Sequence, residues 1–76
     1  MKMNLRKMKK GQAGTIVAVK AMGEVGGRIR EMGMVPGTGI VVQGRAPLKD
    51  PVCLKVMGFT LTLRNSEADY IDVEVG

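Results

Sequence analysis

The side chains that most often carry out chemistry are scarce in this sequence of 76 residues. It contains no histidine, one cysteine (Cys53) and one serine (Ser66). A serine nucleophile needs an adjacent base, usually histidine, and no Gly-Lys-Ser or Gly-Lys-Thr is present to form a phosphate-binding loop. Ser66 is followed three residues later by Asp69, which is the form of a capping box around one helical turn. We therefore expect a protein that is not an enzyme.

The side chains left for binding a metal ion are carboxylates and the lone thiol. Ferrous iron sites usually combine carboxylates with histidine, and structural zinc sites combine cysteine with histidine. Asp69, Asp72 and Glu74 lie close together in the sequence. Asp72 and Glu74 alternate with apolar residues, which predicts the solvated face of a strand. We expect no specific metal site and no cofactor.

Positive charge is concentrated at the start of the chain. The formal net charge is +5, and five of the 12 basic residues fall in the first ten positions: Lys2, Arg6, Lys7, Lys9 and Lys10. The other seven basic residues equal the acidic residues in number. This basic segment, residues 1–10, is either a solvated, solubilising leader or a surface that attracts an anionic membrane or an acidic partner.

Alternation of apolar and polar residues predicts five short strands. They cover Ala13–Val19, Ile40–Arg45, Val52–Met57, Phe59–Arg64 and Tyr70–Val75. The inward positions of the third and fourth strands would be Val52, Leu54, Val56, Phe59, Leu61 and Leu63. Closing so few strands into a small β-barrel buries one face and protects the strand edges.

One short helix is predicted between the first two strands, over Glu24–Met32. Its barrel-facing side would carry Val25, Ile29 and Met32. Gly33 fits the left-handed position that ends a helix. Pro36 and Gly37 then occupy the two central positions of a type II turn.

A partner-binding surface is predicted on the exposed side of this helix and on its exit turn, through Arg28, Arg30, Met34 and Pro36. Both arginines should project into solvent, beside a rigid turn that needs little ordering, and Arg and Met are enriched in interfaces. Two alternatives stay open: the arginines only solvate the helix, and Met34 staples the helix end to Ile29. Met22 and Met57, also near turns, are either contact or packing residues.

The length allows one small domain, residues 1–76, supported by close packing or by self-association. No apolar run approaches the roughly 20 residues that span a bilayer, and no signal-peptide core follows the basic start. A single free cysteine favours a reducing compartment. We expect a cytoplasmic protein, with peripheral attachment at the inner face of the membrane as a further option.

Residues 28–37, Arg-Ile-Arg-Glu-Met-Gly-Met-Val-Pro-Gly, resemble the pattern of the FeoA family, in which a basic helix is followed by Gly, an apolar pair and Pro-Gly. Further similarities follow in the same order: Ala46-Pro47-Leu48 with Asp50-Pro51, the strand at 58–64, and Ser66-Glu67-Ala68. The glycine-rich stretch at 22–27 departs from the pattern at the helix start. The resemblance spans nearly the whole chain.

This resemblance implies a mainly β fold: a small five-stranded SH3-like barrel with one short helix after the first strand and a single helical turn before the last. It also implies a non-enzymatic cytoplasmic accessory protein of ferrous iron uptake, which binds the cytoplasmic part of a FeoB-type membrane transporter and modulates its activity or assembly. Transition metal ion binding would follow by family association only.

The alternative function is a small basic barrel that binds nucleic acid, as a ribosome- or RNA-associated module. Single-strand binding usually needs aromatic stacking platforms, and this chain has one Tyr and one Phe, with Phe59 expected in the core. We therefore expect neither nucleic acid nor a small-molecule substrate as a partner.

Overall fold

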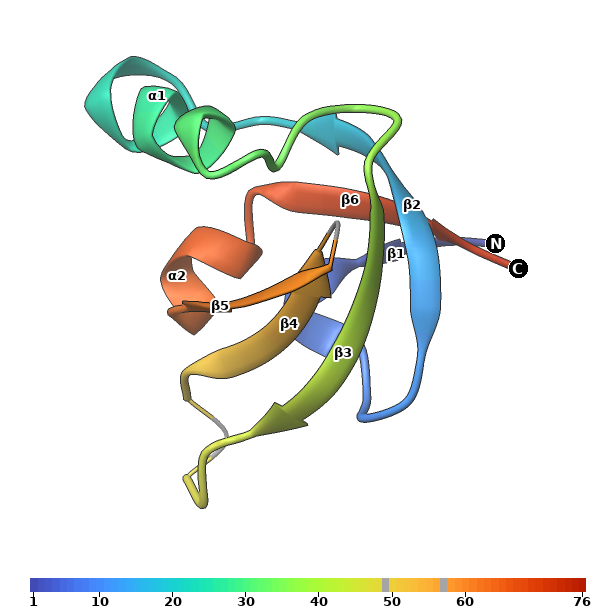
Figure 1. Cartoon of the computed structure of the whole chain (residues 1–76). Helices are drawn as coiled ribbons and strands as arrows, with labels where there is room; N and C mark the ends of the chain where they lie inside the picture. Colours follow the sequence, from blue (N-terminus) through green and yellow to red (C-terminus); the bar gives the residue numbers. More distant parts are fainter. Residues whose placement is uncertain (49, 57) are drawn as a thin grey trace.

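The computed structural model describes residues 1–48, 50–56 and 58–76. These residues form six strands, two α-helices and a short 3-10 helix (Figure 1). In chain order the elements are β1 (Lys2–Asn4), η1 (Leu5–Lys7), β2 (Ala13–Val19), α1 (Gly23–Glu31), β3 (Gly39–Arg45), β4 (Val52–Val56), β5 (Phe59–Leu63), α2 (Asn65–Ala68) and β6 (Ile71–Val75). The predicted mainly β fold is confirmed.

The strands form one sheet in the order β1-β6-β2-β3-β4-β5, and each neighbouring pair is antiparallel. The register shifts between Ile16 and Ala18 where β2 meets β6, and between Val42 and Gly44 where β3 meets β4. Such bulges bend a strand and increase its twist, so the sheet curls around a single core. α1 stands at one end of the curled sheet, and α2 joins β5 to β6 below it (Figure 1).

The sheet has one strand more than the five expected, because the basic N-terminal segment enters it. β1 pairs with β6, with Met3 opposite Val73. Three residues are too few to show alternation, so the sequence pattern alone did not reveal this strand. Leu5 and Met8 follow it and are buried in the core. The segment is therefore part of the fold, while most of its charged side chains face solvent.

One side chain fastens this segment to the rest of the molecule. The guanidinium group of Arg45, at the end of β3, donates hydrogen bonds to the carbonyl oxygens of Leu5 (3.3 Å), Arg6 and Met8 (3.0 Å). It also donates to the Asn65 side-chain oxygen at the start of α2, at 2.8 Å. Arg45 thus joins η1, β3 and α2.

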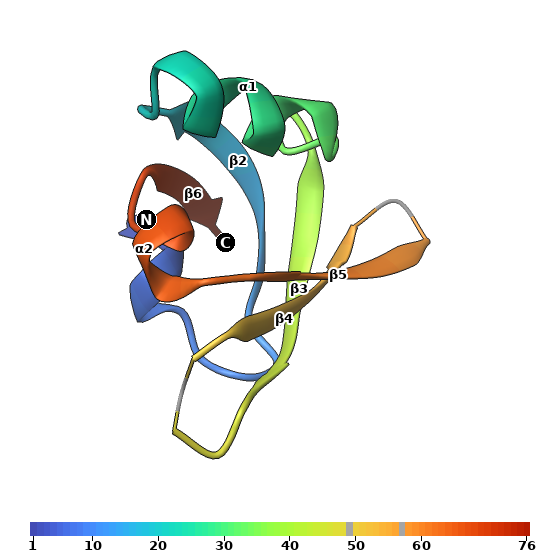
Figure 2. The same cartoon turned by 90° about the vertical axis from the view of Figure 1, so that its left-hand side faces the viewer.

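The core consists of apolar side chains from β2 to β6 and both helices, and it contains all the predicted inward residues of β4. Its buried members are Leu5, Met8, Ile16, Ala21, Ile29, Met34, Ile40, Val42, Val52, Leu54, Val56, Leu63, Ala68, Ile71 and Val73. The inward placement of Phe59 is wrong as a burial prediction, since this side chain is 47% exposed. Phe59 pairs with Val56 at the end of the β4–β5 hairpin, which extends beyond the body of the sheet (Figure 2).

The end of α1 follows the sequence closely. Gly33 has φ +91°, its N–H donates to the Arg30 oxygen (3.0 Å), and the Met34 N–H donates to the Ile29 oxygen (3.3 Å). This pair of bonds is the Schellman arrangement. The type II turn follows, with Gly37 at φ +96° and the Thr38 N–H bonded to the Val35 oxygen at 3.1 Å.

The start of α1 differs from the prediction. Ile29 is buried and Met32 packs partly against the core, but Val25 is 39% exposed. Gly26 is the buried residue instead. This part of the helix packs directly on the backbone of the segment that leads into α1. A Cβ atom at position 26 would lie 2.4 Å from the Ala21 oxygen and 2.6 Å from Arg30 Nη1. Within the glycine-rich helix start, close packing therefore requires glycine at position 26.

We predict that the adjacent glycines 26 and 27 respond oppositely to alanine. Gly26→Ala should lower the free energy of unfolding by about 1–3 kcal/mol, because the new methyl group has no room. Gly27→Ala is the matched control: nothing lies within 4 Å of its Cβ position, so it should raise stability by about 0.5–1 kcal/mol through helix propensity. Urea unfolding measures both, and equal effects at the two positions would contradict the packing argument.

Candidate partner-binding site

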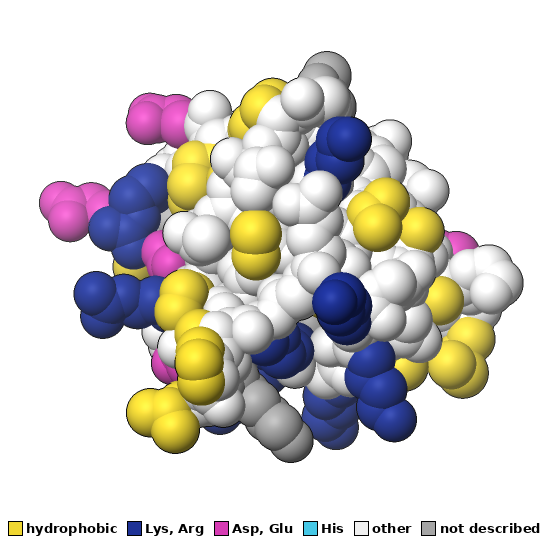
Figure 3. All heavy atoms as spheres, turned by 60° about the horizontal axis from the view of Figure 1, so that its bottom comes forward, with side chains coloured by type: hydrophobic (Ala, Val, Ile, Leu, Met, Phe, Trp, Pro, Cys, Tyr) yellow, Lys and Arg dark blue, Asp and Glu magenta, His cyan; other side chains and the backbone are white. Residues whose placement is uncertain are grey.

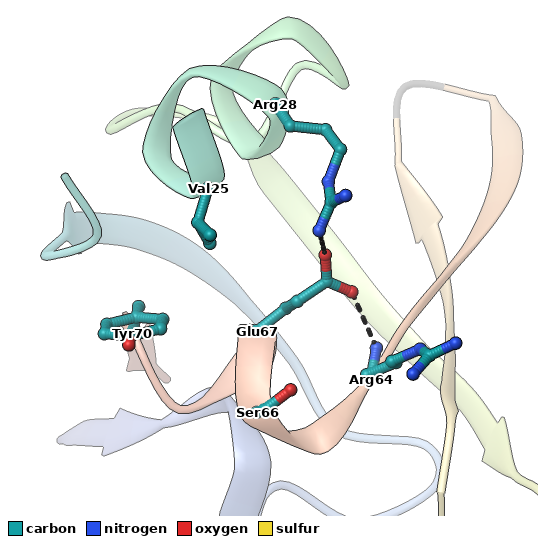
Figure 4. Close-up of a pocket in the computed structure, with 6 residues that line it drawn as sticks. All are labelled: Val25, Arg28, Arg64, Ser66, Glu67 and Tyr70. Carbon is teal, nitrogen blue, oxygen red and sulfur yellow. Dashed lines mark hydrogen bonds and ion pairs between the residues drawn. The ribbon is translucent and has the colours of Figure 1, made fainter. Parts of the chain in front are cut away.

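A shallow groove separates α1 from α2. Its lining comes from Val25, Arg28, Arg64, Ser66, Glu67 and Tyr70. Val25 and Arg28 point from α1 toward α2, and Tyr70 closes one end (Figure 4). The groove therefore combines one ion pair with two partly exposed apolar side chains.

The ion pair across the groove joins Arg28 to Glu67, with Nη2 and Oε2 2.6 Å apart. The other oxygen of Glu67 accepts the backbone N–H of Arg64 at 3.0 Å, which fixes the carboxylate at the start of α2 (Figure 4). The Glu67 side chain is only 14% exposed, whereas that of Arg28 is 63% exposed. An exposed guanidinium in such a pair contributes little to stability and can exchange its partner.

The predicted capping role of Ser66 is wrong. The N-cap of α2 is Arg64, two residues earlier, so the helix begins at Asn65 and Ser66 is exposed in its first turn. Two carboxylates cap the helix instead: Glu67 accepts the Arg64 N–H in a capping box, and Asp50 Oδ1 on the β3–β4 loop accepts the Asn65 N–H at 2.9 Å. Sequence reasoning missed this long-range cap because it looks only a few residues upstream.

The predicted site residues have different environments. Arg28 and Pro36 are exposed, as expected, and so is Val35 beside Pro36. Arg30 is exposed as a residue, but its guanidinium donates to the backbone oxygens of Val19 (3.2 Å) and Ala21 (3.0 Å). Arg30 therefore holds the end of β2 against α1 and does not project freely into solvent.

Met34 is fully buried, so its predicted contact with a partner is wrong. It lies directly after Gly33 in the Schellman arrangement and shares the core with Ile29, which was the alternative interpretation. Met22, at the start of α1, is 85% exposed. Met57, the third methionine considered, lies outside the described residues.

Residues 3–75 match the FeoA domain model. The chain belongs to the FeoA family.

A relative from Porphyromonas gingivalis, named an Fe(2+) transport protein A/Fe(2+) transporter FeoB fusion protein, is 40% identical over 73 residues. The match covers 96% of this chain and 9% of that relative. An NMR structure of a FeoA-like protein from Clostridium acetobutylicum is 35% identical, with a TM-score of 0.90 over 97% of this chain and 86% of that one. The Stenotrophomonas maltophilia FeoA complexed with zinc, described as a prokaryotic SH3 domain protein, is 24% identical with a TM-score of 0.82, over 95% and 89% of the two chains. These similarities confirm the SH3-like fold.

In this FeoA-family chain the basic N-terminal residues fall into two groups. Lys2 lies 3.9 Å from Asp72, and Arg6 lies 3.9 Å from Asp69. Lys7, Lys9 and Lys10 are exposed, and no ion pair to an acidic side chain is found for them within the described part of the chain. Within the basic N-terminal segment, the positive charges without an acidic partner are therefore confined to residues 7–10.

Asp72 does not lie on a solvated strand face as predicted, because it is buried between two lysines. Lys20 Nζ lies 2.9 Å from its Oδ2, and Lys2 approaches from β1. The hydrogen bond from Lys20 lowers the pKa of Asp72 below its usual value, and the charges of Lys20 and Lys2 add to this against the opposing effect of burial. Glu74 is exposed and pairs with the N-terminal amine.

The described residues contain no group of three or more His, Cys, Asp or Glu side chains close enough to hold a metal ion. No helix within residues 1–48, 50–56 and 58–76 is long and apolar enough to cross a membrane.

We predict that Asp72 makes stability depend on acid pH. Because its folded-state pKa lies below the unfolded value, its contribution is complete above the unfolded pKa and is lost as pH falls through the folded one. Asp72→Asn should cost about 1.5–3 kcal/mol at neutral pH. The difference from the parent protein should then shrink below about pH 4. Urea titrations over this range measure it.

Asp69→Asn is the matched control for Asp72→Asn. It removes the same charge from an exposed pair that is 3.9 Å apart, so it should change the free energy of unfolding by less than about 1 kcal/mol. If the free energies of unfolding of the parent protein and of Asp72→Asn differed by the same amount from neutral to acid pH, the lowered pKa assigned to Asp72 would be contradicted.

Proposed function

We propose that this protein is a non-enzymatic accessory of ferrous iron uptake, which binds the cytoplasmic part of a FeoB-type transporter and modulates its activity or assembly. The observation that carries the proposal is the fusion relative, in which the matching segment and FeoB share one polypeptide. Fusion keeps two modules at high effective concentration, an arrangement that favours modules acting through mutual contact. A non-enzymatic role also suits a chain that lacks histidine and has one serine.

The docking surface we propose consists of Arg28, Val35 and Pro36, together with Val25 and Tyr70 in the groove. The exit turn is already ordered, because the Ile16 N–H bonds the Thr38 oxygen (2.9 Å) and the Gly37 N–H bonds the Ile16 oxygen (2.8 Å). A contact through this turn therefore needs little further ordering. Arginine and tyrosine are enriched in interfaces, and both are exposed here.

Arg28 can act as the charged anchor of this surface. Glu67 keeps its bond from the Arg64 N–H when Arg28 moves, so the loss of Arg28 does not leave Glu67 without a partner. A carboxylate on the transporter can then replace Glu67 as the partner of the guanidinium. The cytoplasmic face of the membrane is the place where such contact occurs, and the single free cysteine suits that reducing compartment.

We predict that Arg28→Glu weakens binding to the cytoplasmic part of a FeoB-type transporter from the same organism by about 5–150-fold, the scale of hot-spot losses. The melting temperature should fall only modestly, because position 28 is 63% exposed and the new carboxylate can turn from Glu67 into solvent. Lys55→Glu, which reverses an exposed charge on β4, is the matched control and should retain affinity. Calorimetry or surface plasmon resonance measures the affinities.

Arg30 is not a suitable target for that experiment, since its substitution removes two backbone contacts and changes stability. If the folded Arg28→Glu variant retains full affinity, the interface lies elsewhere on the molecule, and the basic N-terminal segment is the next place to test.

We also propose that the protein holds no tightly bound resident iron or zinc. The chain has no histidine, Cys53 is its lone thiol, and the Asp72 carboxylate is occupied by lysines. Anaerobic calorimetry with Fe²⁺ and with Zn²⁺ should detect no 1:1 binding tighter than micromolar. Such binding, lost on Cys53→Ser or on a carboxylate substitution, would refute the proposal.

A further inference from the structure

The end of the molecule opposite α1 carries a second groove, unrelated to the α1–α2 site. η1 and the residues after it form one wall, and the β3–β4 loop forms the other, so that Lys7, Lys9 and Lys10 face Ala46 and Pro47. Both walls are fastened by Arg45, which binds the carbonyl oxygens of Leu5 and Met8. We call this region the basal surface, comprising Arg6, Lys7, Lys9, Lys10, Pro47 and Leu48.

The basal surface carries three lysines whose charge no acidic side chain offsets in the described part of the chain. Lys7, Lys9 and Lys10 are exposed with no acidic partner in the described part of the chain, and Arg6 has only Asp69 at 3.9 Å. Figure 3 brings this end forward and shows Lys and Arg side chains gathered over its lower part, between groups of hydrophobic side chains. Three uncompensated lysines on a domain of net charge +5 form a strong local positive potential.

An exposed leucine lies on the loop that forms the second wall of this groove. Leu48 is 91% exposed at the tip of the β3–β4 loop, directly after the exposed Pro47 that lines the groove. Cations around a protruding aliphatic side chain match an anionic lipid surface, where the cations meet headgroups and the leucine enters the acyl boundary. Nucleic acid would use the cations but not the leucine, and among the described residues no aromatic side chain lines this groove for base stacking.

We propose that the basal surface docks the protein on membranes rich in anionic phospholipid, through Lys7, Lys9 and Lys10 with Leu48 as the inserting side chain. This goes beyond the general basicity of residues 1–10, because Lys2 is engaged by Asp72 and takes no part. It does not depend on binding to a transporter. Each lysine near such a surface strengthens binding by about fivefold, so the three together contribute about 100-fold.

The test is co-sedimentation of the full chain with vesicles of phosphatidylcholine alone or mixed with phosphatidylglycerol. We expect binding only to the mixed vesicles, weakening as salt is added because the charges are exposed. Lys9→Gln/Lys10→Gln should reduce partitioning by about 25-fold. The remote pair Lys55→Gln/Arg64→Gln removes the same charge and should reduce it by no more than about threefold. Leu48→Ser should reduce it by about tenfold without changing net charge.

Three results would overturn the proposal. The first is equal binding to neutral and mixed vesicles, and the second is equal loss in the basal and remote double variants. The third is tight binding of a single-stranded oligonucleotide that is abolished by Lys9→Gln/Lys10→Gln, combined with a Leu48→Ser variant that binds both the oligonucleotide and the vesicles as the parent does. This third result would assign the surface to nucleic acid. Melting curves confirm that each variant is folded, and all five substituted residues are exposed.

Discussion

The guanidinium group of Arg45 is the contact on which the arrangement of this small domain depends most. A 3-10 turn at the edge of a curled sheet leaves carbonyl groups without strand partners, and buried carbonyls need donors. Arginine supplies several donors in a fixed planar fork, so one side chain serves Leu5, Arg6 and Met8 and still reaches Asn65. Leu5 and Met8 can then enter the core, which closes the lower end of the curled sheet.

Local patterns in the sequence were sufficient for most of the fold. Alternation identified β4 and its buried face, because each inward position there contacts the same core. The glycine after α1 and the Pro-Gly turn were also predictable, since their backbone requirements are met within six residues. β1 was not, because a three-residue strand has no period of its own and exists only through its pairing with β6.

The candidate site was less predictable, because its features arise between distant parts of the chain. Helical spacing correctly predicted that Arg28 is exposed, but it could not show that Glu67, 39 residues later, faces it. The same spacing predicted that Arg30 is exposed, but it could not show that its guanidinium turns back to the backbone oxygens of Val19 and Ala21. The sequence pattern places Asp72 at an outward strand position, and only the approach of Lys20, directly after β2, and of Lys2 from β1 explains its burial.

The two ends of the chain lie side by side (Figure 1). The N-terminal amine bonds the Val75 oxygen at 2.8 Å, and β1 and β6 run antiparallel next to each other. A polypeptide continuing from either end would leave the domain at nearly the same point, so joining it before or after a larger protein is geometrically almost equivalent. Such a domain can be inserted into a loop as readily as appended, because a host loop needs to open by little more than the spacing of two strands.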